Sequence, residues 1–266
     1  MTQIDLNASL YAKLQGRAQQ SGQTIEEWLS HRVEPKPRPD LEALYNWFAR
    51  LIAHDLRTPL AAILTSSDIL KHYEDRMTRE RKVEHLDTIQ MQVRGLNNLL
   101  DNIMVIQKLE AGTLNFDPVS QDLAELCQSA ISSAREVCFH ETDVSFRAAG
   151  ERHMIEFDEK LLGLALVNVL TNAFRFSPPD SPVTMQLATT PQQATIVVQD
   201  AGSGLVADEL PHVFDLFFTG SNALAVGGKG LGLAVAQRIV ALHHGTIDLH
   251  SAVGQGTSVT ISLPVH

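Results

Sequence analysis

The sequence has little that would suit an extracellular protein or a membrane span. Its two cysteines, Cys127 and Cys138, lie eleven residues apart, which is no metal-ligand spacing and favours two reduced, partly buried thiols. The longest apolar runs, such as LLGLALV at 161–167, fall well short of the roughly 20 residues that a membrane span needs. The N-terminus has no basic region followed by an apolar core. We therefore expect a cytoplasmic protein with no secretory signal and no membrane partner.

A basic surface is also missing, because the 266 residues carry a net charge of -10 and a pI near 5.5. Proteins that bind nucleic acid or anionic lipid through charge need an excess of lysine and arginine. The apolar content of 44% suits globular folding, and the length allows two compact units or one with an accessory module. We expect a soluble globular protein without a nucleic-acid partner.

The clearest break in composition is VEPKPRPD at 33–40, where three prolines alternate with charged residues and predict a linker at 34–40. Residues 1–33 read as one strand and two short helices, an order similar to a ribbon-helix-helix protein. So small a unit buries too little surface alone, which predicts a dimerisation or docking module. Two features argue against recognition of DNA by this strand. Asp5 lies on the strand, and residues 1–40 carry five basic and five acidic side chains.

Residues 41–111 predict a helical hairpin. Asp40 can cap a helix that runs to about residue 73, and the polar stretch EDRMTRE separates it from a second helix. Five apolar residues of the second helix follow one another at coiled-coil spacings of 4, 3, 4 and 3: Ile89, Val93, Leu96, Leu100 and Ile103. Since two antiparallel helices leave an apolar face in water, we expect a four-helix bundle built from two chains.

Residues 112–266 change character and alternate short β-rich runs with helical stretches. Helices are expected at 121–136, 158–175 and 231–243. Strands are expected in DVSFRA, PVTMQLAT, ATIVVQDA, TIDLHSA and TSVTISLP. The fold class predicted for this part is an α+β sandwich, one mixed sheet covered by helices.

The first segment whose side chains could take part in a reaction is FARLIAHDLRTPLAAIL at 48–64. His54 and Thr58 share one helix face, and Asp55 is the immediate neighbour that can fix the imidazole tautomer and leave the other nitrogen nucleophilic. Pro59 offers no N–H to the carbonyl of Asp55, so we expect a bend beyond the histidine. A lone surface histidine is inert more often than not, so the interpretation of His54 as a catalytic residue depends on the other segments.

LVNVLTNAFRFSP at 166–178 places Asn168 and Asn172 one above the other on a helix whose opposite face is apolar. An asparagine oxygen is a reasonable hard ligand for Mg²⁺ carried by a nucleotide, although polar residues at a helix edge are the simpler alternative. In VVQDAGSGL at 197–205 a strand runs into Asp200, Gly202 and Gly204. The Asp200 carboxylate can accept a hydrogen bond from an exocyclic amine such as that of adenine.

GGKGLGLAVAQRIV at 227–240 opens a helix with four glycines and Lys229, an anion site suited to phosphates. A dinucleotide-binding fold is the alternative for such a turn. That fold requires its glycines directly after the first strand of a βαβ unit, whereas SNALAVGG, which looks like a flexible loop, precedes them here. The dinucleotide hypothesis therefore fails on context.

In this order, and with the phenylalanine cluster VFDLFF at 213–218, the segments resemble the sensor histidine kinases of two-component systems over about residues 41–266. HDLRTPL is similar to the family's H-box, LVNVLTNAFRFSP to its N-box, DAGSG and GKGLGL to its glycine boxes, and HHGTIDLHSAVGQGTSVTISLP to its closing hairpin. The resemblance implies a dimeric hairpin domain at 41–111 that carries the phosphoacceptor His54. It also implies a catalytic domain at 112–266 that uses ATP and Mg²⁺.

The resemblance further implies roles for single positions. Catalytic positions are His54, Asp55, Thr58 and Asn168, with Thr58 placing water for phosphatase activity. Asn172 supports the metal and Asp200 holds the adenine, within a nucleotide site made of Asn172, Arg175, Asp200, Gly202, Gly204, Lys229, Gly230, Leu231 and Gly232. The phosphoryl group then passes to an aspartate of a response-regulator receiver domain.

Three positions depart from the family pattern. Arg175 stands where lysine is frequent, Phe176 replaces a frequent tyrosine, and Thr219 follows VFDLFF where arginine is common. These departures predict slower transfer rather than lost activity. Two other functions stay open: a kinase-derived scaffold whose nucleotide site no longer works, and a DNA-associated regulator that uses the N-terminal module. The intact asparagine and glycine segments argue against the scaffold.

Overall fold

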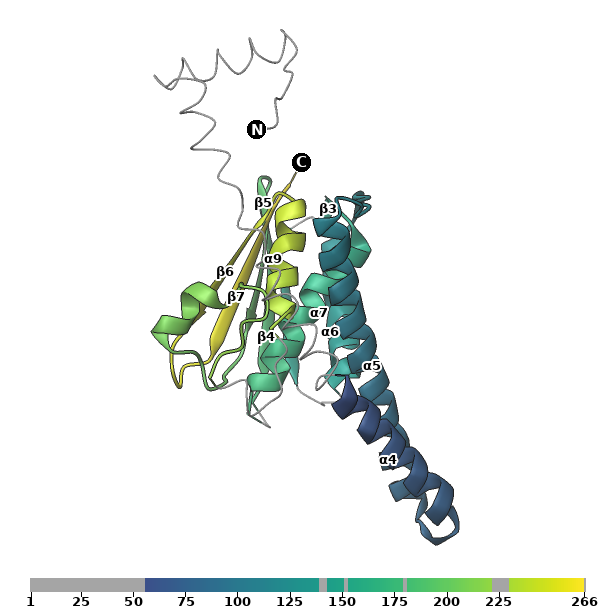
Figure 1. Ribbon diagram of the computed structural model, residues 1–266. Helices are drawn as coiled ribbons and strands as arrows, with labels where there is room; N and C mark the ends of the chain where they lie inside the picture. The colour runs from purple at the N-terminus through teal and green to yellow at the C-terminus, as the bar shows by residue number, and fades with distance from the viewer. Residues whose placement is uncertain (1–55, 139–142, 151–152, 179–180, 222–229, 266) are drawn as a thin grey trace, which may run out of the picture. The chain divides into compact units, whose positions relative to one another are not determined.

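The computed structural model describes residues 56–138, 143–150, 153–178, 181–221 and 230–265, without the side chain of residue 74 (Figure 1). These residues belong to the second of two compact units, Ile52–His266. The predicted module at 1–33, the linker at 34–40, the His54–Asp55 pair and Lys229 all lie outside the described residues. Among the described helices, none is long and apolar enough to cross a membrane.

The first described elements form a helical hairpin. Helix α4 (Arg57–Tyr73) and helix α5 (Arg79–Glu110) are joined through the short 3-10 helix η2 (Glu74–Arg76) (Figure 1). Pro59 lies in the first turn of α4, where its missing N–H is not needed by the helix. The hydroxyl of Thr78 caps α5 by accepting a hydrogen bond of 3.4 Å from the N–H of Arg81. The second predicted helix is confirmed, and the first is confirmed over 57–73, including its end near residue 73, while its predicted start after Asp40 lies outside the described residues.

Large apolar side chains stay exposed along this hairpin. Two of the five coiled-coil positions, Val93 and Leu100, are 42% and 48% exposed. Exposed residues of the same kind on the two helices are Leu60, Leu64, Val83, Leu86 and Met104. Large apolar side chains left exposed on a single hairpin support the predicted pairing of two hairpins into a four-helix bundle.

A five-stranded mixed sheet forms the other part of the unit, in the order β2-β4-β5-β7-β6. Only the β2–β4 pair is parallel. The strands are β2 (Val144–Ala149), β4 (Val183–Thr189), β5 (Gln193–Gln199), β6 (Thr246–Ser251) and β7 (Thr257–Pro264). All five correspond to predicted strands.

Three helices cover one face of this sheet: α6 (Leu123–Cys138), α7 (Glu159–Phe176) and α9 (Gly232–Leu242) (Figure 1). Alternation along the strands explains the single covered face, because Val183, Met185 and Leu187 of β4 are buried while the residues between them are more exposed. The result is the predicted α+β sandwich.

A second, two-stranded sheet pairs β1 (Val119–Asp122) with β3 (Met154–Phe157) antiparallel. This sheet is not predicted from the sequence, because strands of four residues give too short an alternation to recognise. The other unpredicted element is the 3-10 helix η3 (Ala207–His212), which follows the first glycine segment.

The N-terminus of α7 is fixed by a buried polar cluster around Asp158. Its carboxylate oxygens accept hydrogen bonds from the N–H groups of Leu161 and Asp117, at 3.1 Å and 3.0 Å. Its own N–H donates to Nε2 of His243 at 3.0 Å, while Nδ1 of His243 donates to the carbonyl of Ile239 at 2.8 Å. Burial lowers the pKa of His243, so the ring is held neutral at the end of α9.

Cys127 is buried and Cys138 is half-buried, and both are free thiols, as predicted. Burial raises the pKa of Cys127 to about 12, which leaves the thiol protonated at neutral pH.

Candidate nucleotide-binding site

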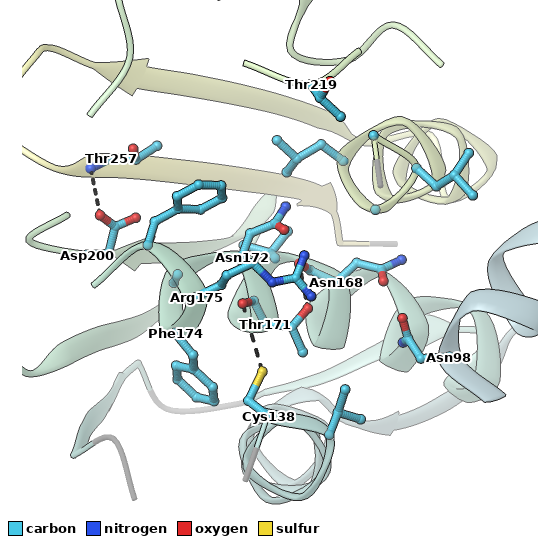
Figure 2. Close-up of a pocket in the computed structure, with 18 of the residues that line it drawn as sticks. Asn98, Cys138, Asn168, Thr171, Asn172, Phe174, Arg175, Asp200, Thr219 and Thr257 are labelled. Carbon is cyan, nitrogen blue, oxygen red and sulfur yellow. Dashed lines mark hydrogen bonds between the residues drawn. The ribbon is translucent and has the colours of Figure 1, made fainter. Parts of the chain in front are cut away.

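A cavity of about 680 Å³ gathers most of the predicted site residues that the structure describes (Figure 2). Its wall combines one side of α7, the end of β5, the start of β7 and the N-terminus of α9 with residues of the hairpin. The predicted residues that line it are Thr58, Asn168, Asn172, Arg175, Asp200, Gly204, Gly230, Leu231 and Gly232. Segments far apart in the sequence thus meet at one cavity of a size that suits a small ligand.

Asp200 lies directly after β5 and is buried. Its Oδ1 atom accepts a hydrogen bond from the N–H group of Gly202 at 2.8 Å. The same atom accepts a second from the N–H group of Thr257 at 3.1 Å (Figure 2). Burial raises the pKa of Asp200, and these two hydrogen bonds act in the opposite direction. Both donors meet the same oxygen, so the carboxylate is fixed in orientation at the cavity wall, where it can accept from an amine of a ligand.

Close backbone approach explains the glycines beside Asp200. Gly202 does not line the cavity, but a Cβ there would lie 2.5 Å from the carbonyl oxygen of Phe176 and 2.8 Å from Oδ1 of Asp200. A Cβ at Gly204 would overlap the carbonyl of Ala252. A side chain at Gly202 would therefore displace backbone that carries a donor to Asp200, and a side chain at Gly204 would force apart its own backbone and that of Ala252.

The second glycine segment meets the phenylalanine cluster. The N–H of Phe217 donates to the carbonyl of Gly230 at 2.7 Å, and a Cβ at Gly230 would lie 2.5 Å from the carbonyl oxygen of Phe218. Helix α9 follows at once, and its N-cap, Leu231, makes no side-chain capping hydrogen bond. The first N–H groups of a helix have no acceptor within the helix, so this end of α9 suits a phosphate group.

Helix α7 presents Asn168, Asn172 and Arg175 toward the cavity (Figure 2). Its apolar face is buried as predicted, through Leu162, Leu166, Val169 and Leu170. Arg175 lies near the half-buried thiol of Cys138, whose pKa is raised by burial and lowered to a smaller extent by the arginine charge.

Asn168 is only 2% exposed, and its amide group pairs with that of Asn102 on α5. Nδ2 of Asn168 donates to Oδ1 of Asn102 at 2.6 Å, and Nδ2 of Asn102 donates back to Oδ1 of Asn168 at 3.1 Å. Asn168 is predicted from the sequence, whereas Asn102 is not. The available signal was the spacing of Asn98 and Asn102, four apart on one helix, which repeats that of Asn168 and Asn172.

One amide oxygen at the cavity is of a kind that could bind the metal carried by a nucleotide. Among the residues that the structure describes, no group of three or more His, Cys, Asp or Glu side chains could hold a metal ion. Mg²⁺ in phosphoryl-transfer sites is usually bound by one or two protein oxygens together with substrate phosphates. The amide oxygen of Asn172, which lines the cavity, is of the hard kind that Mg²⁺ prefers.

Comparison with known proteins agrees with this geometry. Residues 47–112 match the family model described as the His Kinase A (phospho-acceptor) domain. Residues 157–266 match the model of the histidine kinase-, DNA gyrase B- and HSP90-like ATPases. A phosphoacceptor hairpin followed by an ATPase sandwich defines a class of signalling protein. The chain belongs to the sensor histidine kinases of two-component systems.

Sensor histidine kinase RppB of Synechocystis is 31% identical over 229 residues, which cover 82% of this chain and 48% of RppB. The chain spans about half the length, or less, of the first curated relatives that it matches. Among solved structures, the Acinetobacter baumannii histidine kinase AdeS shares the fold at 19% identity and a TM-score of 0.56, covering 80% of this chain and 98% of that one. Full-length ShkA in complex with AMPPNP gives the same TM-score at 21% identity, covering 80% of this chain and 44% of ShkA.

Proposed function

We propose that the chain is an ATP-dependent protein-histidine kinase that phosphorylates itself on His54 and passes the phosphoryl group to an aspartate of a response regulator. The observation that carries this proposal is the cavity that joins Asn172, Arg175 and Asp200 to Thr58, which lies four residues after His54. One cavity wall thus carries the nucleotide-binding residues, and another carries the helix turn that follows the acceptor histidine.

In this reaction a ring nitrogen of His54 attacks the γ-phosphorus of ATP, the bond from that phosphorus to the β–γ bridging oxygen breaks, and ADP leaves. Asp55 holds the opposite ring nitrogen as the N–H tautomer, so that the attacking nitrogen is neutral. The protein contributes mainly positioning and compensation of charge, since phosphoryl transfer requires little else of it.

In the proposed nucleotide site, different residues bind different parts of ATP. Asp200 accepts from the adenine amine, and Asn172 supplies an oxygen to Mg²⁺. The bound ion compensates the charge of the phosphates. Arg175 and the N-terminus of α9 at Leu231 and Gly232 face the phosphate end. Lys229, the residue before Gly230 in the sequence, adds a positive charge to this segment.

The proposed partner is a receiver domain, and the proposed assembly is a homodimer through the exposed apolar surface of α4 and α5. Thr58 places a water molecule for removing the phosphoryl group from the receiver aspartate. RppB supports the kinase assignment, because it is a sensor histidine kinase whose match covers 82% of this chain.

A transfer assay tests the proposal. The chain, first labelled with [γ-³²P]ATP and freed of nucleotide, is mixed with a panel of purified receiver domains. We expect rapid loss of label from the chain and gain of acid-labile label on at least one receiver. A chain that binds no ATP would instead support the scaffold hypothesis, and a mobility shift with DNA at low salt would support the DNA-associated one.

A further inference from the structure

The hydroxyl of Ser251 joins three segments beside the nucleotide cavity. Ser251 lies at the end of β6 and is half-buried, but it is not among the residues that line the cavity. Its Oγ atom accepts a hydrogen bond of 3.0 Å from the N–H of Leu205, in the first glycine segment. It donates to the carbonyl of Gly256 at 2.8 Å and lies 3.0 Å from Oγ1 of Thr257, at the start of β7. Both Leu205 and Thr257 line the cavity, so Ser251 supports the cavity wall from behind.

The protons of this cluster follow from a count of donors and acceptors. A serine hydroxyl has one proton to donate and two lone pairs. Because a carbonyl oxygen carries no proton, the proton of Ser251 is directed to Gly256, and the N–H of Leu205 takes one lone pair. The contact between the two hydroxyls is therefore a hydrogen bond that Thr257 donates and Ser251 accepts. The donor and both lone pairs of Ser251 are then all engaged.

This assignment decides what Thr257 offers to a ligand. Its one hydroxyl proton is used by Ser251, so Oγ1 of Thr257 has only lone pairs left. The backbone N–H of Thr257 donates to Oδ1 of Asp200 at 3.1 Å, which places the two residues next to each other at the cavity wall (Figure 2). Oδ2 of Asp200 has no hydrogen-bond partner among the described residues. These two side chains can therefore accept hydrogen bonds from a ligand, and neither has a proton to donate to it.

We propose that Ser251 is a positioning residue that determines which purine the site binds, because it holds the hydroxyl proton of Thr257 away from the cavity. This inference rests on the proposed kinase function and deepens it, since it concerns how the site selects ATP. Two neighbouring acceptors, Asp200 and Thr257, suit the adenine amine, which has two protons to donate. Hypoxanthine carries an oxo group in place of that amine. Its oxygen would meet two acceptors with no proton between them, and this repulsion disfavours the wrong base.

Titration calorimetry of the full chain with ATP and with inosine triphosphate, each with Mg²⁺, tests the proposal. In Ser251→Ala the hydroxyl of Thr257 loses its acceptor, so it is free to turn and donate to the oxo group of hypoxanthine. We expect the ratio of the Kd for inosine triphosphate to the Kd for ATP to fall by about fivefold, the effect of one hydrogen bond. A merely structural role for Ser251 would weaken the binding of both nucleotides and leave this ratio unchanged.

Three further variants isolate the hydroxyl of Thr257. Ser251→Thr keeps a hydroxyl at this position and should keep the parent's ratio. Ser258→Ala changes another half-buried serine, on β7 and outside the cavity lining, and should also keep it. Thr257→Val removes the proposed acceptor, so it should weaken the binding of ATP but not of inosine triphosphate, and it tests the proposal even if Ser251→Ala folds poorly. Adding Ser251→Ala to Thr257→Val should then change the ratio no further.

The outcomes separate this proposal from the kinase function itself. The parent chain should bind ATP at least about tenfold more tightly than inosine triphosphate, and Ser251→Ala should reduce that preference. Equal ratios in the parent and in folded Ser251→Ala, or equal weakening of both nucleotides in Thr257→Val, would overturn the role of Ser251 and leave the kinase function in place. A parent chain that binds neither nucleotide would reject the nucleotide site, and this inference with it.

Discussion

The carboxylate of Asp200 accepts a hydrogen bond of 3.1 Å from the backbone N–H of Thr257, which joins the end of β5 to the start of β7 (Figure 2). Asp200→Asn keeps the shape of the side chain but offers a donor to the adenine amine. We expect ATP affinity to fall by about tenfold or more, because a hydrogen bond to a charged group is worth about 1.5–3 kcal/mol. Titration calorimetry with ATP and Mg²⁺ measures the change. Asp208→Asn, which alters an exposed acid of η3, should bind like the parent, and equal affinity of both variants would place the adenine elsewhere.

Two glycines in the β6–β7 turn form a matched pair. Gly254 and Gly256 both have a φ of 76°, but a Cβ at Gly254 meets nothing within 4 Å, whereas one at Gly256 would collide with the carbonyl of Asp200. Gly254→Ala should therefore lose only about 1–2 kcal/mol of stability through backbone strain. Gly256→Ala should lose more and should also weaken ATP binding, because it displaces Asp200. Chemical denaturation and calorimetry measure both effects, and equal losses in the two variants would contradict the proposed contact.

His243 gives the stability a pH dependence of defined sign. The folded protein holds the ring neutral, since Nε2 accepts from Asp158 and burial lowers the pKa, so the unfolded chain binds a proton more readily. Stability from this site should be complete above the ordinary histidine pKa of 6.5 and should decline as the pH falls below it.

Urea denaturation across this range measures the effect. His243→Ala should lower stability by about 2 kcal/mol near neutral pH and flatten the acid decline. The control His250→Ala changes an exposed residue of β6 and should alter neither property. An acid decline that persists unchanged in His243→Ala would assign it to another group.

The sequence predicted what depends on neighbours along the chain. The β-rich run PVTMQLAT predicted β4, and the spacing of Asn168 and Asn172 predicted that both lie on one face of α7. Contacts between segments that are far apart in the sequence could not be predicted from it. Asp200 takes one hydrogen bond from Gly202, two residues away, and another from Thr257, 57 residues away, and only the packing of β7 against β5 brings the second donor there. The same holds for Asn102, whose partner is known only once α5 lies against α7.

Thr58, in the first turn of α4, is proposed to serve the phosphatase step alone. Thr58→Ala should keep autophosphorylation within about twofold of the parent and should remove most of the phosphatase activity toward the partner regulator, since a single positioned group is typically worth about 100-fold or more. Thr65→Ala, which changes an exposed threonine further along the same helix, is the matched control. Equal decay of the phosphorylated regulator with parent and Thr58→Ala would reject this role.

ATP-dependent phosphorylation of His54 is the step on which the rest of the proposed function depends. The direct measurement is uptake of acid-labile ³²P from [γ-³²P]ATP with Mg²⁺, followed by mass spectrometry of the peptide that contains the site. His54→Gln should bind ATP with the parent's affinity and take up no label. His72→Gln, which changes an exposed histidine at the end of α4, should be labelled at the parent's rate. Acid-labile label that persists on folded His54→Gln, or its absence from the parent at saturating ATP, would contradict the account.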